Sequence, residues 1–191
     1  MKRQERTLRI IAGQWRGRKL RFPEGEIRPT ADRVRETLFN WLRTRIQGAR
    51  CLDLYAGSGA LGLEALSRGA GSVVFVEQQR AVANALQALL QQWGAVGAQV
   101  HCLQARDYLS RPPGAGRFDV VFLDPPFAAG SSGELLAALS ALAGGWLAPR
   151  ATLYVEHSKS DASLWSELQW RELRAGTAGE VRYHLLEAAE S

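Results

Sequence analysis

The chain has little of what would indicate export, membrane insertion or a bound metal. Its 191 residues include only 2 cysteines, and its 3 histidines are far apart and unaccompanied by cysteine pairs, so metal-ligand spacing is absent. No apolar run approaches the roughly 20 residues that cross a bilayer, and the start, MKRQERTLRI, lacks the apolar core of a signal peptide. We expect a cytoplasmic protein with no metal, in which Cys51 and Cys102 are small buried side chains.

Acidic residues are scarce in the first quarter of the chain. Residues 1–50 carry 14 Lys/Arg against 5 Asp/Glu, whereas residues 51–191 carry 10 against 14, and the net charge is +5. A basic segment joined to a mildly acidic body is typical of a protein that holds a polyanion on one side, although a basic face can also serve solubility alone. We expect nucleic acid as the partner.

From residue 49 onward, short β-rich runs alternate with helical patterns, which predicts an α/β fold with a mostly parallel sheet and helices on both faces. We expect the last two alternating runs, around AGTAGE, to form an antiparallel hairpin at the sheet edge, giving seven strands. The expected single strands are residues 50–55, 72–77, 98–103, 118–123 and 151–156, and the expected helices are 61–67, 80–93 and 132–143.

Residues 1–48 differ in pattern from the rest and are expected to form a small basic extension to the domain of residues 49–191. LRIIAGQWRGRKLRF reads as a short β-hairpin, with Gly13 and Gly17 available for turns. RPTADRVRETLFNWL reads as a helix capped by Thr30. Its inward face would consist of four apolar residues at helical spacing, namely Val34, Leu38, Trp41 and Leu42.

A glycine-rich turn follows the first expected strand of the large domain, in LDLYAGSGALG. Gly57, Gly59 and Gly62 spell G-x-G-x-x-G, which by itself is a weak sign of dinucleotide binding. Asp53 ends that strand, where it can accept from a ligand's ammonium group but would repel a pyrophosphate. Glu77 ends the next strand, where a carboxylate can accept from both hydroxyls of a ribose. Together these features favour S-adenosylmethionine as the cofactor.

The third expected strand ends in LQARDYL, on the same sheet edge. Gln104 and the backbone of Ala105 would lie where an adenine edge rests. Asp107 either joins them or caps the short helix that follows.

The fourth expected strand ends in DVVFLDPPF, and this motif carries the predicted chemistry. An exocyclic amine on a nucleobase is a weak nucleophile because its lone pair is delocalised into the ring. The Asp124 carboxylate and the Pro125 carbonyl, as acceptors for its two N–H groups, would localise that pair toward the methyl donor. Pro126 adds rigidity without a competing N–H, and Phe127 offers a face on which the base can stack. We expect direct transfer to nitrogen.

With these motifs in view, the chain resembles a known family. DLYAGSG and DPPF resemble the two signatures of class I S-adenosylmethionine-dependent amino-methyltransferases. The segments RIIAGQWRGRKL, RPTADRVRETLFNWL and LDLYAGSGALGLEALSRGA are similar to the bacterial 16S ribosomal RNA guanine-N2 methyltransferase family, RsmD, over residues 8 to about 187. The resemblance implies a Rossmann-like class I methyltransferase fold and methylation of the N2 amine of one guanine in small-subunit rRNA, within an assembled or assembling 30S subunit.

The resemblance also assigns residues. The cofactor loop would comprise Asp53, Tyr55, Ala56, Gly57, Ser58 and Gly59, with Glu77 as the ribose acid and Asp124, Pro125, Pro126 and Phe127 as the catalytic tetrapeptide. The arm-to-helix segment would bring Arg28, Thr30, Arg33 and Arg35 to the RNA entrance. To these the basic hairpin adds candidates for phosphate contact, namely Arg16, Arg18, Lys19 and Arg21. Gln104 stands where relatives often have Asp or Asn, and AAGSSG after Phe127 lacks the basic residues of their loop.

Three other functions fit parts of the sequence. A DNA adenine or cytosine amino-methyltransferase needs the same amine acceptors, but so short a chain has no separate target-recognition region. An NAD-binding oxidoreductase would use the glycine loop, but no obvious proton donor lies near the strand ends. A noncatalytic RNA-binding module would not need the acids Asp53, Glu77 and Asp124.

Overall fold

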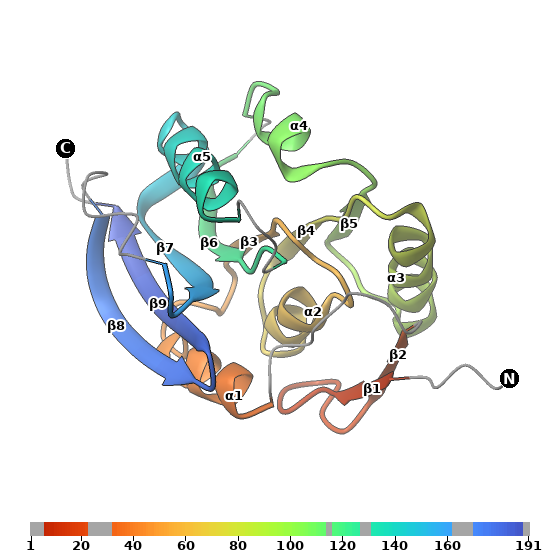
Figure 1. Ribbon diagram of the computed structural model, residues 1–191. Coiled ribbons are helices and arrows are strands. Elements are labelled where there is room, and N and C mark those ends of the chain that lie inside the picture. The colour runs from red at the N-terminus through yellow and green to blue at the C-terminus, as the bar shows by residue number, and fades with distance from the viewer. Residues whose placement is uncertain (1–5, 23–31, 114–115, 127–130, 162–169, 189–191) are drawn as a thin grey trace, which may run out of the picture.

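The computed structural model describes residues 6–22, 32–113, 116–126, 131–161 and 170–188, and a seven-stranded sheet forms its centre (Figure 1). The strand order is β5-β4-β3-β6-β7-β9-β8. All neighbouring pairs from β5 to β7 are parallel, and β9 is antiparallel to β7 and β8 on either side. The expected mostly parallel sheet with an antiparallel C-terminal hairpin is confirmed.

The strands and helices of the large domain alternate as expected, with small shifts at their ends. The strands are β3 (Arg50–Asp53), β4 (Ser72–Val76), β5 (Ala98–His101), β6 (Phe118–Leu123), β7 (Leu147–Ser158), β8 (Trp170–Ala178) and β9 (Val181–Ala188). The helices are α2 (Ala60–Ser67), α3 (Arg80–Trp93), α4 (Ala105–Leu109) and α5 (Ser131–Ala143). No helix among the described residues is long and apolar enough to span a membrane.

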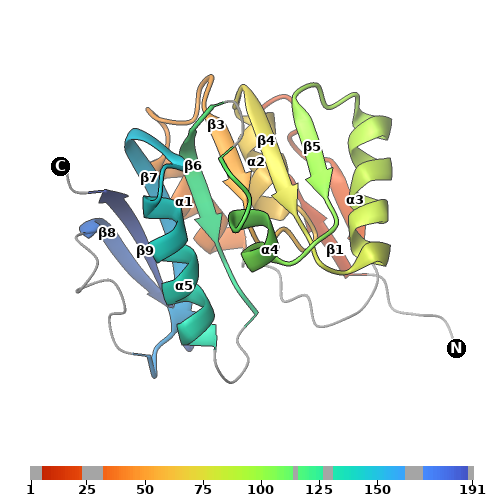
Figure 2. The same cartoon turned by 90° about the horizontal axis from the view of Figure 1, so that it is seen from above.

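Helices cover both faces of the sheet, with α4 and α5 on one face and α2 on the other (Figure 2). Alternate residues of the central strands separate the core into two layers, since successive side chains of a strand point to opposite faces. On β6, Val120 and Phe122 pack with α2 and α3, whereas Val121 and Leu123 pack with α4 and α5. Cys51 is buried as expected. Cys102, however, is exposed, because β5 ends one residue earlier, at His101.

The N-terminal extension forms the two-stranded sheet of β1 (Arg6–Arg9) and β2 (Lys19–Phe22), followed by α1 (Asp32–Trp41). The hairpin is as expected. Val34, Leu38 and Leu42 are buried as expected, Trp41 is only half-buried, and Phe39 is buried although its inward position was not expected. Hairpin and helix share one hydrophobic cluster with α2, α3 and the sheet, so the extension packs into the main core. The predicted cap, Thr30, lies outside the described residues.

The hairpin is held to the C-terminal end of α2 by buried polar contacts. The Ser67 hydroxyl donates to the carbonyl of Ala12 at 2.6 Å and accepts from the N–H of Trp15 at 3.0 Å, and Gln14 N–H donates to the Ser67 carbonyl at 2.8 Å. Gly13 has a φ of +85°, and a Cβ there would lie 1.7 Å from the Ser67 carbonyl oxygen. A glycine is therefore required for this close approach.

Candidate functional site

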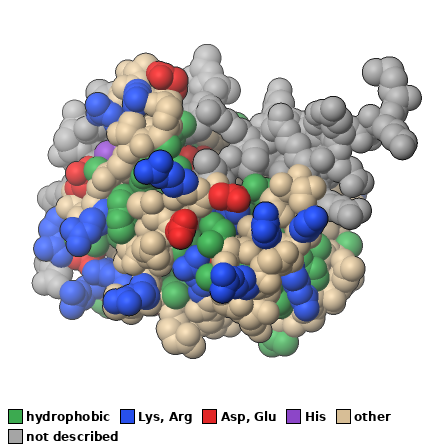
Figure 3. Space-filling view, turned by 90° about the horizontal axis from the view of Figure 1, so that it is seen from below, with side chains coloured by type: hydrophobic (Ala, Val, Ile, Leu, Met, Phe, Trp, Pro, Cys, Tyr) green, Lys and Arg blue, Asp and Glu red, His purple; other side chains and the backbone are tan. Residues whose placement is uncertain are grey.

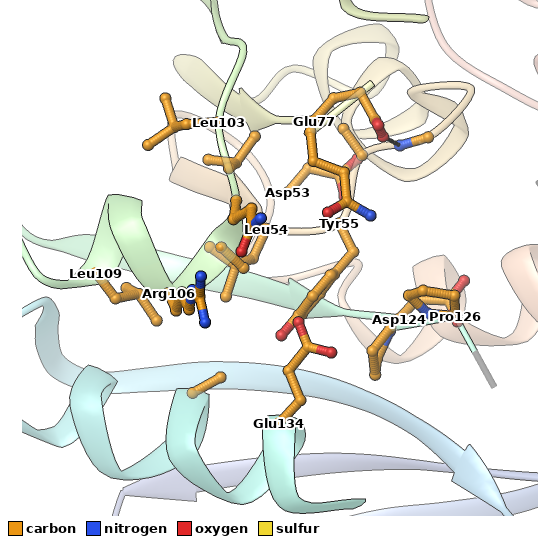
Figure 4. A pocket seen from close by; sticks show the side chains of 18 of the residues that line it. Asp53, Leu54, Tyr55, Glu77, Leu103, Arg106, Leu109, Asp124, Pro126 and Glu134 are labelled. Carbon is orange, nitrogen blue, oxygen red and sulfur yellow. Dashed lines mark hydrogen bonds between the residues drawn. The ribbon is translucent and has the colours of Figure 1, made fainter. Parts of the chain in front are cut away.

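A cavity of about 1180 Å³ opens at the carboxyl edge of the sheet. Its walls come from the segments that follow β3, β4, β5 and β6, and from α4 and α5 (Figure 4). Here β3 has β4 on one side and β6 on the other, so the connections diverge to opposite faces, and ligands of open α/β sheets bind at such a point. The volume suits a ligand larger than a single base or amino acid.

The sequence-based assignment requires that the residues expected to bind the cofactor lie around one cavity, and most of them line this one. They are Asp53, Tyr55, Ala56, Gly57, Ser58, Glu77, Gln104 and Ala105. Gly59 does not line it. Instead Gly59 is the N-cap of α2, with a φ of +75° that a glycine adopts readily, and a Cβ there would meet Leu86 Cδ1 at 2.5 Å. Gly59 therefore shapes the turn and does not contact the ligand space.

The acid at the end of β4 braces the glycine loop. Glu77 is buried, and its two carboxylate oxygens each accept one backbone N–H, from Gly57 at 2.9 Å and from Gln79 at 2.7 Å. An ionised carboxylate offers about four acceptor positions, so two such bonds leave capacity for a ligand's hydroxyls. Glu77 thus fixes the loop and presents acceptors to the cavity at the same time.

The acid at the end of β3, Asp53, is more deeply buried than Glu77. Asp53 is buried and accepts the N–H of Gly62, in α2, at 3.0 Å. Burial raises the pKa of Asp53 from 3.8 to about 7; the Gly62 hydrogen bond lowers it and the negative charge of Glu77 raises it to smaller extents. A cationic group in the cavity would favour the ionised form, because it would supply the counter-charge that burial removes.

A buried hydroxyl also faces the ligand space. Figure 4 shows the Tyr55 hydroxyl pointing toward the neighbouring Glu134 carboxylate, which lines the cavity as well. Burial and the neighbouring Glu134 raise the pKa of Tyr55 above its usual range. Glu134 was not predicted as a site residue from the sequence, because it lies in α5, some 80 positions away from Tyr55.

The cavity therefore fits a cofactor that carries a cation and a ribose. Asp53 lies where it can face an ammonium group, Glu77 can accept from hydroxyls, and Val76 and Leu103 supply apolar surface beside Gln104. Asp107 neither joins Gln104 at the cavity nor caps the short helix α4. It is exposed, lies outside the cavity lining and pairs with Arg106 at 3.4 Å, and the N-cap of α4 is Gln104.

The predicted catalytic motif begins where β6 ends, at Leu123, and part of it borders the same cavity. Asp124 is half-buried and lines the cavity together with Pro125 and Pro126 (Figure 4). Its carboxylate also contributes to raising the pKa of the buried Tyr154 on β7, so the two groups are close. Phe127 lies outside the described residues.

The residues expected to meet RNA separate into two groups. Arg16, Arg18, Lys19 and Arg33 are exposed, and Arg18 lies over the Trp93 ring at 5.3 Å. Figure 3 shows that Lys and Arg side chains outnumber acidic ones on the lower face, where the hairpin and α1 lie. Arg28 and Thr30, and the side chain of Arg21, lie outside the described residues.

Arg35 corrects the sequence-based assignment, because it does not reach the surface. Its side chain is fully buried, and its guanidinium donates to the carbonyl of Arg9 at 2.9 Å and to Asp32 at 2.7 Å. It also lies 3.5 Å from the buried carboxylate of Glu64. Arg35 therefore joins α1 to β1 and α2. A sign of this existed in the sequence, since Glu64 is the one acid in the apolar run ALGLEAL.

Comparison with known proteins gives concordant results over almost the whole chain. Residues 8–187 match the family model described as conserved hypothetical protein 95. The ribosomal RNA small subunit methyltransferase D of Haemophilus influenzae is 45% identical over 181 residues, which is 93% of this chain and 92% of that protein.

Solved structures similar to this chain are also described as methyltransferases. A putative methyltransferase, yhhF, of Escherichia coli superposes with a TM-score of 0.84 at 42% identity, covering 95% of this chain and 98% of the other. A 16S rRNA N2 guanine methyltransferase of Thermus thermophilus, RsmC, solved with AdoMet and guanosine, has a TM-score of 0.72 at 24% identity, covering 97% of this chain and 50% of that one. The second likeness supports the shared class I methyltransferase fold alone.

Proposed function

Because the chain belongs to the family described as conserved hypothetical protein 95, and its curated relatives are named ribosomal RNA small subunit methyltransferase D, we propose that it methylates small-subunit rRNA. The reaction is transfer of a methyl group from S-adenosylmethionine to the exocyclic N2 amine of a guanine. The observation that carries the proposal is the joint lining of one cavity by Asp53, Glu77 and Asp124.

The cofactor would be held by residues that the glycine loop and two strand ends bring together. Asp53 faces its ammonium group, Glu77 accepts from its ribose hydroxyls, and Gln104 and Ala105 border its adenine. When bound, S-adenosylmethionine would supply a methyl group bonded to a positively charged sulfur, and such a methyl group is readily transferred to a nucleophile. The Glu77 bond to Gly57 holds the loop in place before a ligand binds, so binding should require little reorganisation.

Asp124 and the Pro125 carbonyl accept the two N–H groups of the target amine. These acceptors withdraw the amine lone pair from the ring and direct it along the line of transfer. As the new N–C bond forms, the S–C bond breaks with its electrons on sulfur, and the amine becomes cationic. Asp124 is then the nearest acceptor for the proton that the amine loses. Positioning supplies most of the rate, since no covalent adduct with the protein is needed.

The extension of residues 1–48 serves as the RNA-facing part, and residues 49–191 as the methyltransferase domain. Arg16, Arg18, Lys19 and Arg33 are exposed on the extension and supply phosphate contacts. The extension shares its hydrophobic core with α2 and α3, so its position relative to Asp124 is fixed. An RNA backbone that binds to the extension would therefore lie at a defined distance from Asp124. The substrate is rRNA in an assembled or assembling 30S subunit, reached in the cytoplasm.

Labelled S-adenosylmethionine and purified small subunits that lack the methyl group test this function. We expect one label per subunit, recovered as N2-methylguanine in a single oligonucleotide by mass spectrometry. Duplex DNA with unmodified adenine and cytosine is the competing substrate and should take up none. If the subunits stay unlabelled while the Escherichia coli relative labels them, the proposed substrate is wrong.

A further inference from the structure

Two segments of the chain that pack against each other contain no acidic residue. Residues 6–22, which form the hairpin, carry six Lys/Arg and no Asp or Glu, and residues 78–106, which include α3, also have no Asp or Glu. Since the whole chain has 19 Asp and Glu in 191 residues, about three would be expected in a segment as long as the second one. Neither of these two segments therefore brings negative charge to the surface where they meet.

The hairpin meets α3 at the last residue of the helix. The ring of Trp15, between β1 and β2, lies 5.2 Å from that of Trp93, and the guanidinium of Arg18 lies 5.3 Å over the Trp93 ring. Figure 1 shows the hairpin beside this end of α3. Arg18 is exposed even though the indole ring attracts its guanidinium, so its N–H groups can reach a ligand where hairpin and helix join.

The outward face of α3 carries amides and one cation. The buried side chains of this helix are all apolar. On the opposite side, at spacings of four, three and four residues, an exposed stripe runs along the helix, formed by Arg80, Asn84, Gln87 and Gln91. The solvent face of a surface helix usually carries charged residues, whereas three of these four side chains are neutral amides. Amide side chains are among the groups that hydrogen-bond the phosphates and sugars of a nucleic acid.

The stripe on α3 connects the hairpin with the cavity. Gln79, the N-cap of α3, lines the cavity together with Gln78, and the other end of the helix contacts the hairpin through Trp93. A helix rises about 1.5 Å per residue, so α3 spans about 20 Å between these two points. The outward face of α3 thus forms a path without acidic residues from the cations of the hairpin to the rim of the cavity.

We propose that the substrate RNA lies along the outward face of α3, with its sugar–phosphate backbone on the stripe from Gln91 to Arg80, as it passes from the hairpin to the cavity. This inference rests on the proposed function and adds to it the course of the RNA. A strand with one negative charge per nucleotide requires a surface free of acids along its whole path. A protein partner fits the stripe less well, because the centre of a protein interface is rich in apolar and aromatic side chains.

The test changes the charge of the stripe in both directions. One variant combines Gln87→Glu with Gln91→Glu, and the other combines Gln87→Lys with Gln91→Lys. Binding to purified small subunits that lack the methyl group is measured by fluorescence anisotropy at several salt concentrations. Near 0.1 M salt, we expect the Glu pair to weaken binding by at least about 5-fold and the Lys pair to strengthen it by a similar factor. The Lys pair should also increase the magnitude of the slope of log K against log salt by about 1–2.

The matched controls carry the same charge changes far from α3. Ser140 is exposed on α5, which covers the other face of the sheet, and Thr177 is exposed on β8, at the opposite edge of the sheet from β5. Their Glu pair and Lys pair alter the net charge equally and should change the affinity by less than about 2-fold. All four variants should bind S-adenosylhomocysteine like the wild type, which shows that they fold.

Two outcomes would overturn the proposed path. One is a pair of stripe variants whose affinities change no more than those of the controls. The other is a loss of affinity in both the Glu and the Lys pair with an unchanged salt slope, because that pattern indicates a protein partner on the stripe. Failure of the proposed function looks different, since the wild type would then form no N2-methylguanine, whatever the variants do to binding.

Discussion

Arg35 and Glu64 face each other inside the protein, with Nη1 3.5 Å from Oε2 and neither side chain exposed. Glu64 also accepts the backbone N–H groups of Ile11 and Ala12, at 2.9 and 3.0 Å, and pairs with Arg68 at 2.7 Å. Because Glu64 belongs to α2, which begins at the glycine loop, one buried carboxylate joins the basic extension to the element that carries the cofactor loop.

Removal of Glu64 should therefore destabilise the whole protein. Glu64→Ala leaves a buried guanidinium and two backbone N–H groups without their acceptor, and we expect a loss of about 3–5 kcal/mol in the free energy of unfolding. Urea titration followed by circular dichroism measures it. Glu36→Ala, at an exposed position of α1, should change the value by less than about 0.5 kcal/mol. Equal effects of the two variants would contradict the central role of Glu64.

A methyl group on the third glycine of the loop motif should also be costly. A Cβ on Gly62 would lie 2.2 Å from the Phe75 ring, so Gly62→Ala forces α2 away from β4 and should cost about 1–3 kcal/mol. In α5 a Cβ on Gly133 would meet nothing within 4 Å, and Gly133→Ala should stabilise the protein by about 0.5–1 kcal/mol. Thermal unfolding of both variants should show shifts of opposite sign.

The raised pKa of Asp53 predicts that cofactor affinity depends on pH. If the ligand ammonium pairs with the ionised form, the dissociation constant of S-adenosylhomocysteine should fall by up to about tenfold between pH 6 and 8, as the group with a pKa of about 7 ionises. Calorimetry measures the constant. Asp53→Asn should bind more weakly at pH 8 and show almost no change over this range. A wild-type affinity that is flat with pH would exclude the pairing.

The same pKa shift makes a prediction for the unliganded protein. The folded-state pKa of about 7 lies above the unfolded value of 3.8, so the folded state binds more protons between these pH values. The stability that Asp53 contributes is therefore present in full below about pH 4 and is lost as the pH rises through 7. The free energy of unfolding of the wild type, relative to Asp53→Asn, should decline between pH 4 and 8 in urea titrations.

Asp124 should matter for transfer and not for cofactor binding. Asp124→Ala removes an acceptor from the target amine, and we expect kcat to fall by at least about 10²–10³-fold. The affinity for S-adenosylhomocysteine should stay within a few-fold of the wild type, as measured by calorimetry. Retained turnover in single-turnover assays with small subunits would exclude the assigned role.

The exposed cations of the hairpin should determine how RNA binding responds to salt. Replacing Arg16, Arg18 and Lys19 by Gln removes three proposed phosphate contacts, so the slope of log K against log salt should decrease in magnitude by about 2–3. Filter binding at several salt concentrations measures the slope, and S-adenosylhomocysteine affinity should not change. Arg117→Gln, exposed just before β6, is the control with an unaltered slope.

Much of this fold follows from local pattern. Alternating β-rich and helical runs predict the order of strands and helices, since a parallel strand needs a crossover and a helix supplies it. The same rule brings Asp53, Glu77 and Asp124 to one edge, because every parallel strand ends there, and the cavity forms between them. Local sequence thus determined the sheet, the glycine loop and the acids around it.

Tertiary structure decided the rest, because burial depends on what packs against a residue from elsewhere in the chain. Arg35 looks like any basic residue of an amphipathic helix, yet α2 and β1 enclose it and give it a structural role. The sequence by itself therefore determined where the proposed site lies, whereas the packing of distant segments decided which charged side chains are exposed and which are buried.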